Sequence, residues 1–238
     1  MKRLLRITIC CISLLSAAAL PLLAGELIDG VVATVNRKPI LRSDWDEAVR
    51  FEAFMQQKPL SQVTASDRVL ALHRLIDRQL LKAQIVEGEH IQPSVDELQQ
   101  DVAKLRAQIP NGKDDADWRL ILAGYGLNEE IVEQHLREEF EVMNFIEVRL
   151  RPTVHITGDD VEAYYRDELL PDLAKNGAAS VTLNEVEPRI RELLTQQRMD
   201  ELLDTWLHNL RQQSQIHSSV PVPGINAPVD SPHASGVN

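Results

Sequence analysis

Cysteine is almost absent from this sequence of 238 residues, because its two cysteines, Cys10 and Cys11, both lie near the N-terminus. The chain after residue 11 therefore has no disulfide and no thiol nucleophile, so packing alone must stabilise it. Aromatic residues are also few, at 4% of the chain, whereas hydrophobic residues make up 44%. That hydrophobic fraction is enough for a core, and the length is enough for one large domain or two small ones.

The motifs of the common catalytic and metal sites are missing as well. The sequence contains no Gly-rich phosphate loop, no Gly-x-Ser-x-Gly nucleophile elbow and no His-Glu-x-x-His zinc motif. Its 7 histidines lack the spacing of metal ligands. Acidic pairs such as Asp159-Asp160 stand where helices are expected to begin, and the helix dipole explains them there. We therefore expect a protein that is not an enzyme and that binds no cofactor or metal.

Positive charge is scarce, since 25 basic residues face 36 acidic ones. Lys2, Arg3 and Arg6 precede an apolar run from Ile7 to Leu15 and small residues up to Ala24, which is the pattern of a secretory signal peptide. We expect residues 1–24 to be removed as such a signal, although an uncleaved membrane anchor is the alternative. Cleavage would leave 22 basic against 36 acidic residues, a net charge of −14, which disfavours nucleic acid and anionic lipid as partners.

The first structural pattern after this segment predicts a β-hairpin. Val31, Val32, Thr34 and Val35 form a β-branched run that ends at Asn36, and a short apolar run, Ile40-Leu41, follows Pro39. Ser43, with Asp46 three residues later, is predicted to cap the next helix. Because a two-stranded hairpin is marginally stable in water, we expect a later segment of the chain to cover it.

Apolar residues at spacings of three and four predict helices along most of the remaining chain. The predicted helix starts are Thr64 or Ser66, Ser94, Asn128 and Thr157, and a shorter helix is expected over Ala116 to Ala123.

The C-terminal part is predicted to contain the last long helix, which ends near Gln213. A capping box at Thr182 would start it early, but Pro188 would then stand inside the helix, so we favour a start near Val186. Ile216 to Val222 is a possible short strand. From Pro221 onward the chain is rich in Pro, Gly, Ser and Asn, and we expect a disordered tail.

One helix offers candidates for apolar surface that remains exposed after folding. The helix that begins near Ser43 is apolar on more than one side, and Phe51, Phe54 and Met55 lie near its end. We take these three residues as candidate contacts for a bound polypeptide, and plain core packing is the alternative.

The segment from Ile28 to Asn36, followed by Pro39-Ile-Leu-Arg-Ser-Asp44, resembles the opening of the SurA-like periplasmic chaperones. The resemblance covers roughly residues 26 to 218. Further matches follow in the same order, at Leu75–Leu81, Ile91–Glu97, Gly126–Glu130, Leu136–Phe140, Ile156–Asp160, Pro188–Leu194 and Leu202–Leu207.

The chain departs from this family in one respect. Its members normally carry one or two parvulin-type prolyl isomerase domains between the segment that ends near Leu169 and the C-terminal helix. Here only Leu170 to Val181 occupies that place, and the Gly-Gly-x-Leu-Gly-like parvulin signature is absent. The resemblance therefore does not extend prolyl isomerase activity to this chain.

The resemblance implies a mainly α fold: a multi-helix chaperone core with a small N-terminal β-hairpin, closed by a long C-terminal helix and a possible short strand. The implied organisation is a helical chaperone module over residues 25–170, a short linker over 171–181, a C-terminal helix and strand over 182–220 that pack on the module, and the tail over 221–238.

The resemblance also implies a function and a location. The protein is expected to be an ATP-independent periplasmic holdase that binds unfolded outer-membrane proteins, or other exported polypeptides, through an apolar crevice. It would have no stable insertion in the membrane after signal cleavage. The alternative is a non-catalytic envelope adaptor or structural subunit that binds one folded partner.

Overall fold

The computed structural model describes residues 29–223 except residues 87, 89 and 178. The signal peptide expected at residues 1–24 lies outside this range, as does most of the expected tail. Helices dominate the described part, so the expected mainly α class is confirmed. The elements are β1 (Val31–Val35), β2 (Lys38–Leu41), α2 (Arg42–Met55), η1 (Leu60–Gln62), α3 (Ala65–Lys82), α4 (Val95–Gln108), α5 (Asp115–Gly124), α6 (Glu129–Leu150), η2 (Arg151–Thr153), α7 (Gly158–Tyr164), η3 (Tyr165–Leu169), α8 (Leu170–Lys175), α9 (Leu183–Gln213) and β3 (Ile216–Ser218).

The two ends of the described chain meet in a small antiparallel sheet with the strand order β2-β1-β3. Asn36 and Arg37 form the turn between β1 and β2 with φ of 49° and 70°, the left-handed conformation that a tight hairpin needs. The backbone N–H of Asn36 donates to the carbonyl of Gln215 at 2.9 Å, and its side-chain oxygen accepts from the Gln215 N–H at 3.0 Å. The third strand is therefore confirmed, and it runs antiparallel to β1.

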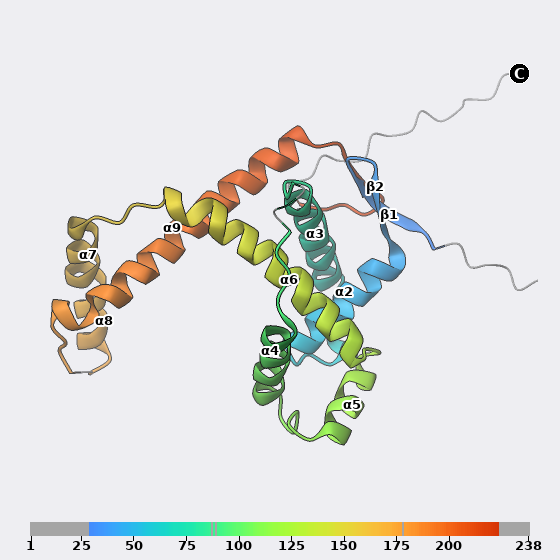
Figure 1. Cartoon of the computed structure of the whole chain (residues 1–238), viewed down its shortest axis with the longest axis horizontal. Coiled ribbons are helices and arrows are strands. Elements are labelled where there is room, and N and C mark those ends of the chain that lie inside the picture. Colours follow the sequence, from blue (N-terminus) through green and yellow to red (C-terminus); the bar gives the residue numbers. More distant parts are fainter. Residues whose placement is uncertain (1–28, 87, 89, 178, 224–238) are drawn as a thin grey trace, which may run out of the picture.

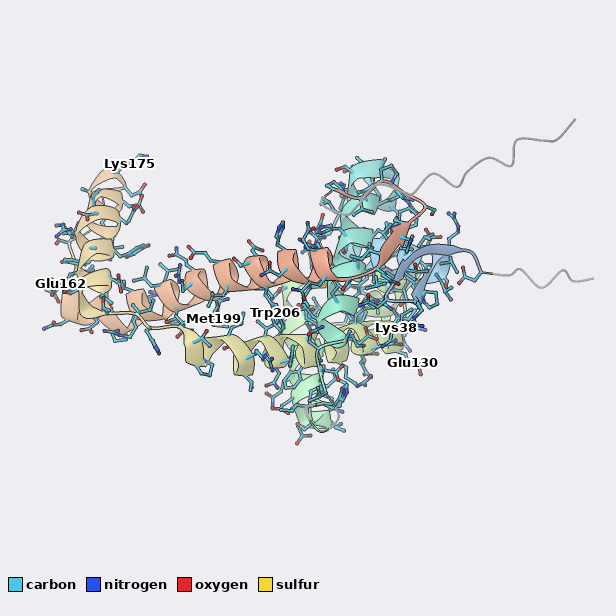
Figure 2. All side chains as sticks on the ribbon, turned by 90° about the horizontal axis from the view of Figure 1, so that it is seen from above. Lys38, Glu130, Glu162, Lys175, Met199 and Trp206 are labelled. Atoms are coloured by element: carbon cyan, nitrogen blue, oxygen red, sulfur yellow. The ribbon has the colours of Figure 1, made fainter. Side chains whose placement is uncertain are left out.

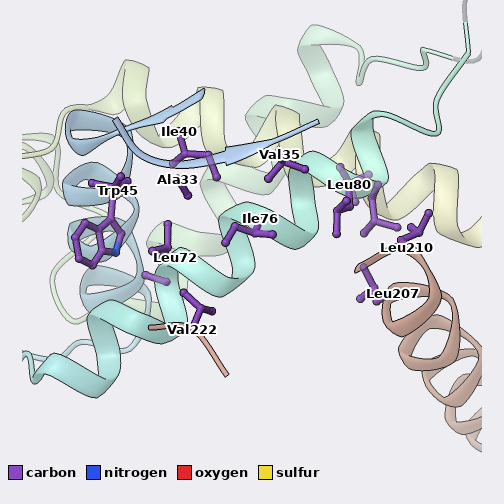
Figure 3. Close-up of a cluster of buried hydrophobic side chains, with 14 of the residues drawn as sticks. Ala33, Val35, Ile40, Trp45, Leu72, Ile76, Leu80, Leu207, Leu210 and Val222 are labelled. Atoms are coloured by element: carbon purple, nitrogen blue, oxygen red, sulfur yellow. The ribbon is translucent and has the colours of Figure 1, made fainter. Parts of the chain in front are cut away.

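The hairpin is covered by α3, and the C-terminal half of α9 packs beside α3 in the same cluster (Figure 3). Leu72, Ile76 and Leu80 of α3 are at most 1% exposed and face the sheet, whereas Leu207 and Leu210 arrive from α9. Burial of a side chain of this kind contributes about 1.5–3 kcal/mol. The same cluster contains Val222, which is 7% exposed. The tail predicted from Pro221 onward is thus wrong at its first residues, because Val222 has a place in the core.

A second core cluster lies between the end of α2, the end of α4, α5 and the start of α6. Trp118 and Leu122 of α5 are both 1% exposed, and Val132 of α6 is fully buried. The rings of Phe54 and Trp118 meet edge to face, with centroids 5.7 Å apart. Such aromatic pairs contribute about 0.5–1.5 kcal/mol beyond the area that they bury.

Helix α2 begins earlier than the predicted Ser43 cap. Arg42 is its first residue, and the backbone N–H of Leu41 donates to Oδ2 of Asp44 at 3.0 Å. Ser43 instead donates from its hydroxyl and from its backbone N–H to the carboxylate of Asp29. An acidic side chain that precedes β1 therefore satisfies a helix-start donor, a long-range contact that local spacing does not predict.

Away from these cores, the molecule extends into an arm (Figure 1). We define the arm as residues 158–193, which comprise α7, η3, α8 and the N-terminal turns of α9. Figure 2 shows Glu162 and Lys175 of the arm at one end of the molecule and Lys38 at the other, with Met199 and Trp206 between them. Helix α9 is continuous from the arm to the sheet, so it fixes the position of the arm relative to the core.

Ion pairs hold the arm where α6 and α9 cross. Arg151 pairs with Glu147 of α6 and with Glu192 of α9, with a shortest nitrogen–oxygen distance of 2.6 Å to Glu147 and 2.9 Å to Glu192. Arg191 donates to the carbonyl of Ile156 at 2.6 Å. The ring of Phe145 packs against that of Trp206, with centroids 5.8 Å apart.

Two prolines are tolerated in helices where the sequence predicted breaks. Pro188 lies inside α9, which starts at Leu183 with the Thr182–Glu185 capping box, so the favoured start near Val186 is wrong. Only the carbonyl of Asn184 loses its helical donor, and Asn184 is exposed, so water can replace that donor.

Pro171 follows the π-helical turn η3 and lies in α8, so the segment expected to be a linker from residue 171 is helical to Lys175. The wider π turn reduces the clash between the proline ring and the preceding turn.

Candidate binding sites

The three residues predicted to contact a bound polypeptide lie close together but differ in exposure. Phe51 is 7% exposed and Phe54 is 1% exposed, and both belong to the second core cluster. Met55, at the end of the same helix, is 40% exposed. Of the three, the structure leaves Met55 at the surface, and Phe51 and Phe54 have the position that core packing predicts. Contact of any of these three residues with a bound polypeptide stays a prediction.

Phe51 has a further partner at the edge of that cluster. Its ring stacks on the imidazole of His135 in α6, with centroids 4.0 Å apart and planes inclined by 9°. Nε2 of His135 lies 3.2 Å from Oε1 of Glu47, whereas the buried Nδ1 has no hydrogen-bond partner. Burial lowers the pKa of His135, and the nearby guanidinium of Arg78 lowers it further, against the opposing effect of Glu47 and Glu138. The imidazole is therefore held in its neutral form.

A polar cavity of about 320 Å³ opens beside His135, between β2, α2, α3 and α6. Its charged side chains come from both signs: Lys38, Arg78, Lys82, Asp44, Glu47 and Glu138. Nitrogen atoms of Arg78 and Lys82 each lie 3.8 Å from Oε2 of Glu138, so the charges compensate one another. Within residues 29–223, where described, no cluster of three or more potential metal ligands occurs. The charges that line this cavity balance one another, so it does not suit an apolar polypeptide segment.

An apolar cavity that suits a bound polypeptide lies in the arm, and we call it the arm pocket. It has a volume of about 370 Å³ and is lined by Tyr164, Leu169, Leu173, Val181, Val186, Arg189, Ile190 and Leu193. Ile190 is 3% exposed and forms its floor, whereas Leu193 is 40% exposed. Pockets of about 300–1,000 Å³ with apolar walls and few polar groups are typical binding sites.

Hydrogen bonds at helix ends position the walls of the arm pocket. The hydroxyl of Tyr165 donates to the carbonyl of Val181 at 2.6 Å and so ties the segment before α9 to η3. Thr182 and Glu185 cap the start of α9, and Thr157 and Asp160 cap α7 in the same way. Val161 of α7 is 1% exposed against α9. The arm is thus a small packed unit, and residues of α7, η3, α8 and α9 line its pocket together with Val181.

Local patterns in the sequence predict only part of this pocket. The family resemblance implies a short linker over residues 171–181, whereas Leu173 and Val181 from that range line the pocket. The helical turn of α8 brings Leu173 to the same place as residues of α9. That convergence depends on the reversal of the chain after Lys175, which apolar spacing does not predict.

None of the helices in the described ranges is both long enough and apolar enough to cross a membrane.

Comparison with known proteins identifies one family. The model of the SurA-like N-terminal domain matches residues 7–146. This match spans the hairpin, α2 to α5 and most of α6. It therefore includes both core clusters except for Leu150 and the contributions of α9 and the C-terminal segment. The arm lies beyond it. No curated protein matches the chain.

Proposed function

This chain belongs to the SurA-like N-terminal domain family, and from that premise we propose that it is an ATP-independent chaperone that binds unfolded polypeptides. The observation that supports the proposal most directly is the arm pocket, an open apolar cavity at the end of an extended molecule. Unfolded chains expose the large apolar side chains that such a cavity accepts. Reversible contacts of this kind would shield those side chains from one another and so slow aggregation.

The proposal extends to the site of action and to the clients. We propose that residues 1–24 direct export to the periplasm and that the clients are unfolded outer-membrane proteins or other exported polypeptides. The acidic composition, with a net charge of −11, supports a carrier that repels its own copies. We further propose that the protein has no prolyl isomerase activity, and a protease-coupled peptide assay should then show no isomerisation above background.

A light-scattering assay tests the chaperone function. An outer-membrane protein unfolded in urea is diluted into buffer without ATP, in the presence of a several-fold molar excess of the protein. We expect the rise in scattering to be suppressed. Scattering equal to that of the client alone would contradict the proposal.

A pair of variants tests whether the arm pocket contributes. Leu193→Asp places a charge in the pocket wall and should weaken suppression, because the client would have to desolvate a carboxylate. Leu120→Asp is the matched control, since Leu120 of α5 is 71% exposed and lies outside the arm. Equal activity of the two variants would exclude the arm pocket as the client site. A pull-down that gives one stoichiometric folded partner would favour the adaptor alternative.

A further inference from the structure

The arm pocket has only two polar groups in its lining, the hydroxyl of Tyr164 and the guanidinium of Arg189. Both are hydrogen-bond donors at neutral pH. Neither side chain forms a hydrogen bond or ion pair with any residue that the structure describes. Two unused donors therefore border one apolar cavity.

Arg189 is unpaired because the neighbouring carboxylates of α9 have other partners. Glu185, one turn earlier, accepts hydrogen bonds from the backbone and hydroxyl of Thr182 at 2.8 and 2.9 Å. Glu192, one turn later, pairs with Arg151 at 2.9 Å. The donors of Thr182 lower the pKa of Glu185, and Arg151 lowers that of Glu192, so both carboxylates are ionised in these contacts.

The third carboxylate near Arg189 is also engaged. Glu187 pairs with Arg191 at 2.9 Å. The guanidinium of Arg189 is consequently available to bind a ligand at the pocket. Other parts of the arm surface are acidic, with exposed carboxylates at Asp159, Glu162, Glu168 and Asp172, so an anionic ligand is favoured beside Arg189 and repelled elsewhere on the arm.

We propose that the arm pocket binds the C-terminal residue of an unfolded polypeptide. The apolar side chain of that residue fills the cavity, and its α-carboxylate accepts hydrogen bonds from Arg189 and Tyr164. A chain terminus combines an apolar side chain with a carboxylate on the same residue, which an internal apolar residue does not. The inference rests on the proposed chaperone function, because it names the part of the client that the arm pocket recognises.

Fluorescence polarisation with two short peptides tests the inference. The probe is fluorescein-labelled Gly-Ser-Gly-Ser-Gly-Phe, with either a free C-terminal carboxylate or a C-terminal amide. We expect the full-length protein to bind the free acid about fivefold more tightly than the amide, the effect of one partly exposed ion pair. Equal affinity for the two peptides, or no binding of either, would overturn the inference.

Two variants locate the preference. Arg189→Gln should reduce the affinity for the free acid to that for the amide and leave the amide unaffected. Arg198→Gln removes an exposed arginine from the same helix, where it pairs with Glu201, and should keep the fivefold preference. Loss of the preference in both variants, or in neither, would contradict a role of Arg189. Thermal melts followed by circular dichroism must show that Arg189→Gln folds like the parent protein.

The light-scattering assay separates this inference from the proposed function. Suppression of aggregation without a preference for the free acid would overturn C-terminal recognition and leave the chaperone function intact. A clear preference for the free acid without suppression would support the pocket as a peptide site and contradict the chaperone function.

Discussion

Among single residues, His135 is one of two polar or charged side chains that are buried in the described part of the chain, the other being Glu141. His135 lies between Glu47 of α2, Arg78 of α3 and Glu138 of its own helix, and its ring is stacked on Phe51. Nδ1 of His135 is buried and has no hydrogen-bond partner. Protonation of the imidazole would therefore place a charged donor at a position without an acceptor. A buried polar atom without a hydrogen-bond partner lowers the stability of the fold, here at the junction of its two cores.

This environment predicts loss of stability in mild acid. Because the pKa of His135 is lowered in the folded state, the unfolded chain takes up the proton first, and stability falls as the pH drops below about 6.5. Melting temperatures at pH 7.5 and pH 5 should therefore differ less for His135→Phe than for the parent protein. His155→Phe, at an exposed position, should behave like the parent. An unchanged acid response in His135→Phe would contradict the assignment.

Among the elements, helix α9 keeps its helical conformation although it contains a proline, a residue that disfavours the interior of a helix. Proline inside a helix costs about 3 kcal/mol, yet α9 passes through Pro188 to reach the Thr182–Glu185 capping box. The early start is favoured by the capping box, in which Glu185 accepts hydrogen bonds from the backbone N–H and the hydroxyl of Thr182.

Pro188→Ala should therefore stabilise the arm. The alanine N–H can donate to the carbonyl of Asn184, and we expect an increase of about 1–3 kcal/mol in the local stability of α9. Hydrogen exchange of the amides near Val186 should slow accordingly. Pro59→Ala is the contrasting change, since Pro59 precedes η1 in a connector, and it should lower the stability slightly by loosening the unfolded chain. Unchanged exchange in Pro188→Ala would show that the proline imposes no strain.

The sequence predicted the elements more fully than their junctions. Helix α3 was predictable because Leu72, Ile76 and Leu80 repeat at helical spacing, and β1 because its residues are β-branched. The start of α2 was not, since Asp29 supplies the hydrogen bonds from outside the helix. For the candidate site, Phe51 and Phe54 were chosen as apolar residues, but apolar residues on two sides of a helix can also mean two cores, as they do here.

For the whole molecule, the C-terminal segment closes the first core cluster. Met199, Leu207, Leu210 and Val222 are each at most 8% exposed and all belong to the first core cluster. Arg211 of α9 also forms a two-bond pair with Asp77 of α3, at 2.8 and 2.6 Å, and both side chains are largely buried. Removal of this segment would expose the apolar side chains of α3 and leave Asp77 without its arginine.

A fragment of residues 26–170 should therefore fail to fold as the full chain does. We expect it to lose the cooperative melt or to melt far below the full-length protein. Addition of a separate peptide of residues 183–223 at high concentration should restore part of the helical signal. Cooperative melting of the fragment at the full-length temperature would show that the N-terminal half is an independent folding unit.

The pairing of β1 with β3 also sets the order of events during synthesis. Ser219 donates to the carbonyl of Val32 at 3.0 Å across a sequence separation of 187 residues. During synthesis β1 is made first, but its sheet is complete only after nearly the last described residues have been made. The entropy of closing so long a loop slows that step. Until then the first core cluster lacks the residues that α9 and Val222 contribute to it. Completion of the fold is timed by the arrival of its C-terminal strand.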